Sequence, residues 1–186
     1  MLGSIDKTAL EREYDEGGKR ILVESRPPKT IDEGVRAKRS VSIEDEVRMF
    51  RRDKFVCRYC GRRTIFVPTL RALSLLYPGA LPYQGHWERE ACHRVYWIFS
   101  TVRGYVDPIS RGGTPDMDNL VTTCGTCTFR KKNWRPEEIG WEVQPVPPTT
   151  LYWDGLSTQF VRLWTASPAI HREGDLQQWY DAIFKS

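Results

Sequence analysis

The chain has 186 residues, of which 40% are hydrophobic and 28% are charged, and its formal net charge is +4. This length favours one domain with additional segments, and the mildly basic charge allows an anionic partner. No apolar run approaches the ~18 residues of a membrane-spanning helix, and the N-terminus lacks the apolar core of a signal peptide. We therefore expect a soluble, cytoplasmic protein in a reducing compartment, without a membrane partner.

The N-terminal segment, residues 1–40, is polar and charged, and glycine and proline pairs interrupt it. This composition favours a mobile arm. One apolar stretch, Ile21–Val23, could form a short strand.

A helix is expected next, because Ser42 can serve as its N-cap and Asp45 stands at the capping-box position. Ile43, Val47 and Phe50 follow at helical spacing, which predicts one apolar face. Acidic residues come first and arginines last, an order that suits the helix dipole.

Two Cys-x-x-Cys pairs follow, Cys57 with Cys60 and Cys124 with Cys127. Each pair turns tightly enough for both sulfurs to reach one ion, and Gly61 gives the first turn its backbone freedom. Four thiolates suit a tetrahedral, structural Zn²⁺ with no open coordination position. Two disulfides or a redox pair would instead need an oxidising compartment or a thioredoxin-like βαβ pattern, and the sequence shows neither.

A long insertion, residues 64–101, separates the two cysteine pairs. Pro68 is expected to start a helix that ends before Pro78. The aromatic segment 86–99 predicts a buried strand or helix, and the pattern does not distinguish the two. Cys92 fits a small buried hydrophobe.

The second cysteine pair is preceded by strand-like residues and followed by helix-like ones. Tyr105-Val106 and Leu120–Thr123 favour strands, with tight turns between them. A helix is expected from Cys124 to about Asn133. Further helices are expected near Pro136 and, beyond a Pro-rich linker, over 160–164 and 176–184.

Together, the segment from Phe55 to Trp134 resembles the HNH endonuclease family. The resemblance rests on Phe-Val-Cys-Arg-Tyr-Cys-Gly and on Pro-x-Ser-Arg-Gly-Gly-Thr-x-x-x-x-Asn-Leu-Val-Thr-Thr-Cys-x-x-Cys-x-x-x-Lys. It implies an α+β protein with a ββα-metal core, a four-cysteine structural zinc site, an inserted helical and aromatic segment, and C-terminal helices. The implied organisation is an arm over 1–40, a zinc domain over 41–144, and a linker with a helical segment over 145–186.

Most of the catalytic residues of that family are replaced in this sequence. The pattern places Gly104 at the metal-binding Asp, Tyr105 at the general-base His and Thr128 at the last metal ligand, while Asn119 matches the Asn that fixes the loop. Glycine offers no ligand, and a threonine hydroxyl is a poor ligand for a hard cation. Tyrosine acts as a base only as phenolate, which is scarce at neutral pH. The resemblance therefore implies an impaired nuclease centre.

Asp107 offers one substitute. In a strand its side chain would share a face with that of Tyr105, so it could bind Mg²⁺ or Mn²⁺ beside a tyrosine base. Alternatively, Asp107 simply makes a turn before Pro108. His86 and His93 could be recruited as ligands, or they are packed or surface residues.

A basic cluster flanks the cysteine pairs and the Gly-Gly loop. In the resembled fold such residues surround the helix that borders the DNA minor groove, and they bind phosphates without reading sequence. The resemblance therefore implies DNA as the partner, with largely sequence-independent recognition. Any single one of these residues could instead be a solvated side chain at a helix end. The residues are Arg62, Arg63, Arg111, Arg130, Lys131 and Lys132.

Three functions follow from these patterns. The first is an HNH-like DNA-binding protein with an impaired nuclease centre. The second is an active metal-dependent endonuclease that uses Tyr105 and Asp107. The third is a zinc-knuckle scaffold that binds a protein partner through its aromatic insertion and C-terminal helix.

Overall fold

The computed structural model describes residues 41–86, 88, 90–148 and 152–185. The expected N-terminal arm and the strand at Ile21–Val23 lie outside these residues. The structure is mixed helix and strand, which confirms the α+β class. Among the described residues no helix has both the length and the apolar character to cross a membrane.

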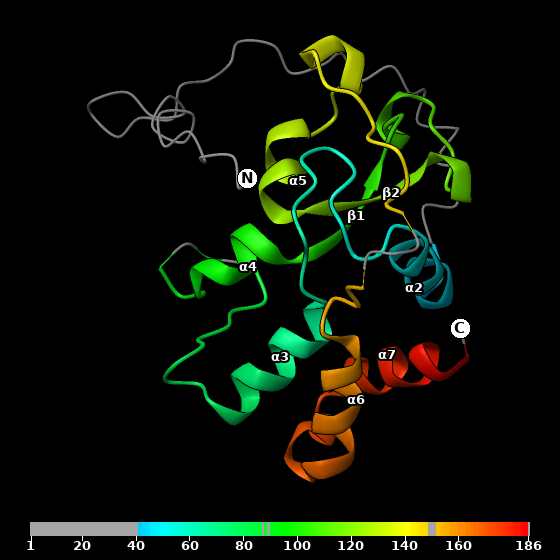
Figure 1. Ribbon diagram of the computed structural model, residues 1–186. Helices are drawn as coiled ribbons and strands as arrows, with labels where there is room; N and C mark the ends of the chain where they lie inside the picture. Colours follow the sequence, from blue (N-terminus) through cyan, green and yellow to red (C-terminus); the bar gives the residue numbers. More distant parts are fainter. Residues whose placement is uncertain (1–40, 87, 89, 149–151, 186) are drawn as a thin grey trace.

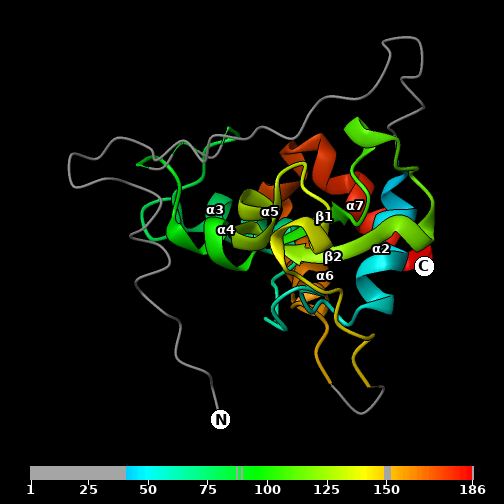
Figure 2. The same ribbon diagram turned by 90° about the horizontal axis from the view of Figure 1, so that it is seen from above.

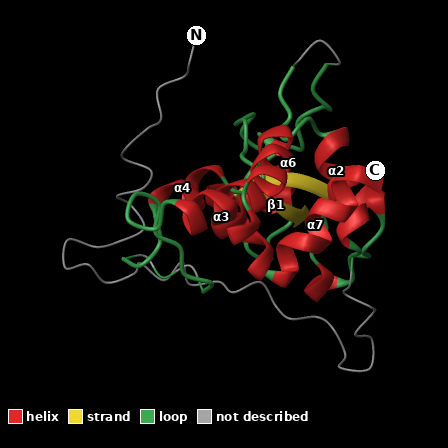
Figure 3. Cartoon of the chain, turned by 90° about the horizontal axis from the view of Figure 1, so that it is seen from below, coloured by secondary structure: helices red, strands yellow, loops and turns green. Residues whose placement is uncertain are grey.

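The centre of the fold is a two-stranded antiparallel sheet followed directly by a helix. Strand β1 (Thr101–Tyr105) pairs with β2 (Leu120–Cys124), and α5 (Gly125–Lys131) begins at the end of β2. Both strands were expected close to these positions, although the first begins earlier than Tyr105. Figures 2 and 3 show α4 (Arg94–Phe99) on one side of the strands and α2 (Ile43–Arg52) on the other. In Figure 1, α3 (Val67–Leu76) and α7 (Gly174–Lys185) both lie below the strands.

Helix α2 (Ile43–Arg52) begins as its sequence predicts. The Ser42 hydroxyl accepts a hydrogen bond from the Asp45 amide at 3.1 Å and donates to the Asp45 carboxylate at 2.7 Å. Val47 and Phe50 are buried in the main core. The local capping signal therefore fixes the helix start, and its apolar face attaches it to the rest of the chain.

The insertion forms two helices, α3 (Val67–Leu76) and α4 (Arg94–Phe99). The aromatic segment is thus a helix in its second half. Tyr96 is fully buried there, and its hydroxyl lies 2.7 Å from that of Ser74 on α3. This contact joins the two helices of the insertion. Cys92 is buried beside them, as expected for a small hydrophobe.

The C-terminal elements pack into the same core as α2 (Figure 1). Phe160 and Trp164 of one helix and Leu176 of another are buried with Phe50 and Phe66. The segment beyond residue 145 therefore shares the main core with the preceding segment. These elements are α6 (Ser157–Ala166), η5 (Pro168–Arg172) and α7 (Gly174–Lys185). The short helix η4 (Pro136–Ile139) precedes them, and η2 (Ile109–Arg111) and η3 (Met117–Asn119) lie between the strands.

One buried carboxylate joins three of these parts. Asp53 is fully buried and accepts hydrogen bonds from Arg52, from Arg58 at 2.7 Å and from the Thr122 amide at 2.7 Å. Arg58 lies inside the first cysteine pair, and Thr122 lies on the strand that ends at Cys124. Asp53 thus ties the end of α2 to both cysteine pairs.

Candidate metal centre and the neighbouring sheet–helix site

The four paired cysteines come together, with their sulfur atoms within 4.8 Å of one another. Cys57, Cys124 and Cys127 are buried, and Cys60 is exposed. Sulfurs bound to one zinc at about 2.3 Å in a tetrahedron are about 3.8 Å apart, and the Cys60 and Cys124 sulfurs lie 3.8 Å apart. The donor set and its spacing therefore fit one metal ion.

Local backbone geometry explains why each pair turns inward. The Gly61 amide donates to the Cys57 carbonyl at 2.9 Å, and Gly61 has a φ of +70°, which glycine adopts without strain. In the second pair, the Cys124 sulfur accepts a hydrogen bond from the Cys127 amide at 3.4 Å and caps α5. One pair is thus shaped by a glycine turn and the other by a helix start.

The thiols influence one another strongly. Contacts with Cys124 and Cys127 lower the pKa of the Cys60 thiol, whereas the contact with Cys124 raises the pKa of the Cys127 thiol. Neighbouring thiolates repel, so four of them ionise together only beside a cation. Tyr59 and Trp141 pack against the cluster, with ring centroids 5.5 Å apart, and shield one side of it.

Thr123 on β2 lies next to both Gly104 and Thr128. A side chain at position 104 would place its Cβ 2.5 Å from the Thr123 methyl carbon. The Thr123 hydroxyl lies 2.6 Å from that of Thr128, and it donates to the Val102 carbonyl at 3.0 Å. Threonine side chains therefore occupy the place between these two positions.

Tyr105 lies on the other face of the sheet. Side chains alternate between the two faces of a strand, and Tyr105 packs against the main core, with the Arg103 guanidinium 5.5 Å from its ring centroid. The geometry therefore separates Tyr105 from the Gly104 and Thr128 positions.

Asp107 and Asn119 organise the loop after β1. The Asn119 side chain accepts from the Asp107 amide at 2.7 Å and donates to the Asp107 and Thr114 carbonyls. The Asp107 carboxylate accepts from Arg135 at 2.8 Å. Asn119 thus fastens the loop, and an ion pair with Arg135 engages the Asp107 carboxylate.

The structure separates the six basic residues by exposure. Arg63, Arg130 and Lys132 are exposed, and Arg62 is half-buried, with its guanidinium 5.4 Å from the centre of the Phe99 ring. Arg111 pairs with Glu138 and Lys131 is buried.

Lys131, the last residue of α5, is buried, and burial changes the pKa of its ammonium group. It is only 4% exposed, and loss of solvent lowers the pKa of its ammonium to about 8, although Asp107 and Glu138 act in the opposite direction. A lysine held this way is poorly placed to contact a phosphate at the surface.

Other features of the site are absent from the sequence patterns. The hydrogen bond from the Thr122 amide to Asp53 and the ion pair of Glu46 with Arg103 join residues far apart in the chain, and no local motif marks them. His86 and His93 are both exposed. The four cysteines are the only group of metal-ligating side chains found among the described residues.

Comparisons with protein-family models, with curated proteins and with solved structures gave no match to this chain.

Proposed function

We propose that this chain is an HNH-like DNA-binding protein, held together by a structural zinc ion, whose nuclease centre is impaired. The Thr123–Thr128 hydroxyl contact beside Gly104 is the observation that carries the proposal. Three positions where the family has ligands and a base hold glycine, tyrosine and threonine. The order of β1, β2 and α5 beside four clustered cysteines supports the resemblance.

The metal assignment rests on the chemistry of the donors. Four sulfurs favour Zn²⁺ over hard cations such as Mg²⁺. Cys57, Cys60, Cys124 and Cys127 would hold the ion, which would cross-link the first turn to the start of α5. With four protein ligands, it would stabilise the fold.

The alternative of an active nuclease is less well supported by these contacts. Tyr105 packs on the core side of the sheet, and the Asp107 carboxylate is engaged by Arg135. A tyrosine base and an aspartate ligand would have to leave these contacts to meet at one metal. Plasmid relaxation by the unaltered protein tests this point directly.

Gly104→Asp with Thr123→Ser and Thr128→His is expected to create a new metal site. The serine removes the methyl group that would otherwise collide with the new aspartate; without that change, overpacking should cost about 1–3 kcal/mol of stability. We expect one additional Mn²⁺ to bind per chain, measured by the loss of the free-ion EPR signal.

The matched control is Gly79→Asp with Thr165→His, because both positions are exposed and position 79 has open space around it. If the rebuilt protein folds but binds no more Mn²⁺ than this control, the assignment of positions 104 and 128 to a former metal site is contradicted.

DNA binding is proposed to use the exposed basic residues beside the first cysteine pair and at the end of α5. If about four phosphates are neutralised, log K should fall with log salt at a slope near −3.6. Removing two contacts with Arg130→Ala and Lys132→Ala should reduce the slope to about −1.8. Anisotropy of labelled duplex DNA, measured over a range of salt concentrations, gives both values.

Arg162→Ala with Arg172→Ala is the matched control, because it removes the same charge from exposed positions on α6 and η5. This control should keep the original slope. Affinity that does not change with salt would favour the protein-scaffold function instead.

A further inference from the structure

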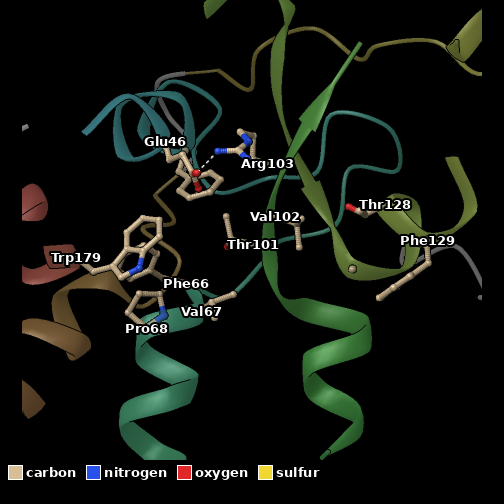
Figure 4. A pocket seen from close by; sticks show the side chains of 12 residues that line it. Glu46, Phe66, Val67, Pro68, Thr101, Val102, Arg103, Thr128, Phe129 and Trp179 are labelled. Carbon is tan, nitrogen blue, oxygen red and sulfur yellow. Dashed lines mark hydrogen bonds and ion pairs between the residues drawn. The ribbon is translucent and has the colours of Figure 1, made fainter. Parts of the chain in front are cut away.

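A cavity of about 320 Å³ lies beside the sheet, between α3 and α7 on one side and α5 on the other (Figure 4). Residues of β1 line it between these two walls. Thr128 also borders the cavity. The cavity therefore adjoins the position where the resemblance places a metal ligand. Ligand sites in proteins are typically cavities of about 300–1,000 Å³ with apolar walls and a few polar groups.

The two walls of the cavity are aromatic. Trp179 stands on one side, half-buried, in edge-to-face contact with the fully buried Phe66, with ring centroids 5.5 Å apart, and Phe129 stands on the other side, 44% exposed. Figure 4 shows these side chains on opposite sides of Thr101 and Val102. Aromatic walls of this kind favour a planar ligand that can stack on them.

The polar group of the cavity is the ion pair between Glu46 and Arg103. Both side chains are mostly shielded, with 17% exposure for Glu46 and 28% for Arg103. Burial raises the pKa of the Glu46 carboxyl, and Arg103 partly offsets this. Their contact joins one carboxylate oxygen to one guanidinium nitrogen, so the other oxygen and several N–H donors have no further hydrogen bond among the described residues.

We propose that this cavity binds an unpaired nucleobase of DNA. A base is planar and small enough for the cavity, and its edge carries hydrogen-bond donors beside acceptors. The ion pair offers a carboxylate acceptor and guanidinium donors to that edge, which a purely aliphatic ligand would not use. Arg130 and Lys132 lie exposed near the end of α5, where they can contact the phosphates of the same strand.

This inference rests on the proposed DNA binding and specifies its substrate, which is DNA with an unpaired nucleotide. The probes are short strands built from abasic spacers, with either one central base or none, so that the number of phosphates stays constant. We expect the strand with one base to bind about tenfold more tightly than the strand without a base, a gain typical of one stacked base.

Glu46→Gln and Phe129→Ala should each remove most of that gain. Glu44→Gln is the matched control for the first, because it makes the same change at an exposed position of α2, and Phe184→Ala is the control for the second. Thermal denaturation of each variant verifies that it is folded. If Glu46→Gln fails to fold, the test rests on Phe129→Ala and on the indole N–H resonance of Trp179. That resonance should shift when deoxynucleoside monophosphates are added, but not when deoxyribose phosphate is added.

The outcomes separate the two proposals. If duplex DNA and the base-free strand bind but a base adds nothing, the nucleobase site is overturned and DNA binding stands. If the strand with one base binds and duplex DNA does not, the nucleobase site is supported and the proposed binding of duplex DNA is overturned. If no DNA probe binds and no indole resonance shifts, both proposals are overturned.

Discussion

Cys57→Ser or Cys124→Ser is expected to unfold the protein. Both sulfurs are fully buried in the four-cysteine cluster, and structural zinc contributes about 10–16 kcal/mol in zinc-finger peptides near neutral pH. A domain of ordinary stability has about 5–15 kcal/mol in total. Loss of one of four thiolates should therefore remove the cooperative unfolding transition or lower its midpoint sharply.

Circular dichroism on heating gives the transition, and elemental analysis gives the zinc content, with one ion per chain expected in the unaltered protein. Cys92→Ser is the matched control, because Cys92 is also buried but lies in a different cluster with Leu70 and Tyr96. It should keep its zinc and a cooperative transition. Folded protein without zinc would contradict the assignment of the metal.

Asp53→Ala is expected to cost about 3–5 kcal/mol of stability, because it leaves the guanidinium of Arg58 and the amide of Thr122 without their buried partner. The carboxylate accepts from Arg58 within the first cysteine pair and from the Thr122 amide on β2. The substitution should therefore also accelerate the loss of zinc to a chelator.

Urea denaturation measures the first effect, and the rate of transfer of zinc to a colorimetric chelator measures the second. Asp118→Ala, at an exposed position in η3, is the control and should change the free energy of unfolding by less than about 0.5 kcal/mol. Equal stability of the Asp53 and Asp118 variants would show that the buried ion pairs do not organise the cysteine pairs.

Elements with strong local signals could be predicted from the sequence. The Ser42 cap, Pro68 at the start of α3 and the position of Cys124 before α5 all act within one turn of the helix that they define. The grouping of the four cysteines was also predictable, because two Cys-x-x-Cys pairs suit a single four-coordinate metal ion. The segment that forms α4 was ambiguous, since a short apolar run suits either a buried helix or a buried strand.

Features that depend on long-range packing could not be predicted. Lys131 stands in a basic run with Arg130 and Lys132, and only the fold shows that it is buried. The ion pair between Glu46 and Arg103 joins α2 to β1. In the sequence, Glu46 looks like an ordinary acidic residue of a first helical turn, and nothing nearby indicates a cavity.

Relaxation of supercoiled plasmid is the most direct test of the proposed impaired centre. The unaltered protein, with zinc bound, should leave the plasmid supercoiled in the presence of Mg²⁺ or Mn²⁺, at concentrations where it binds DNA. The physical reason is that positions 104 and 128 supply no strong ligand for a hard cation, and that position 105 lacks the histidine that the resemblance expects as the base. Nicking that EDTA prevents, and that Tyr105→Phe or Asp107→Ala abolishes while Tyr77→Phe does not, would contradict the account and identify an active nuclease.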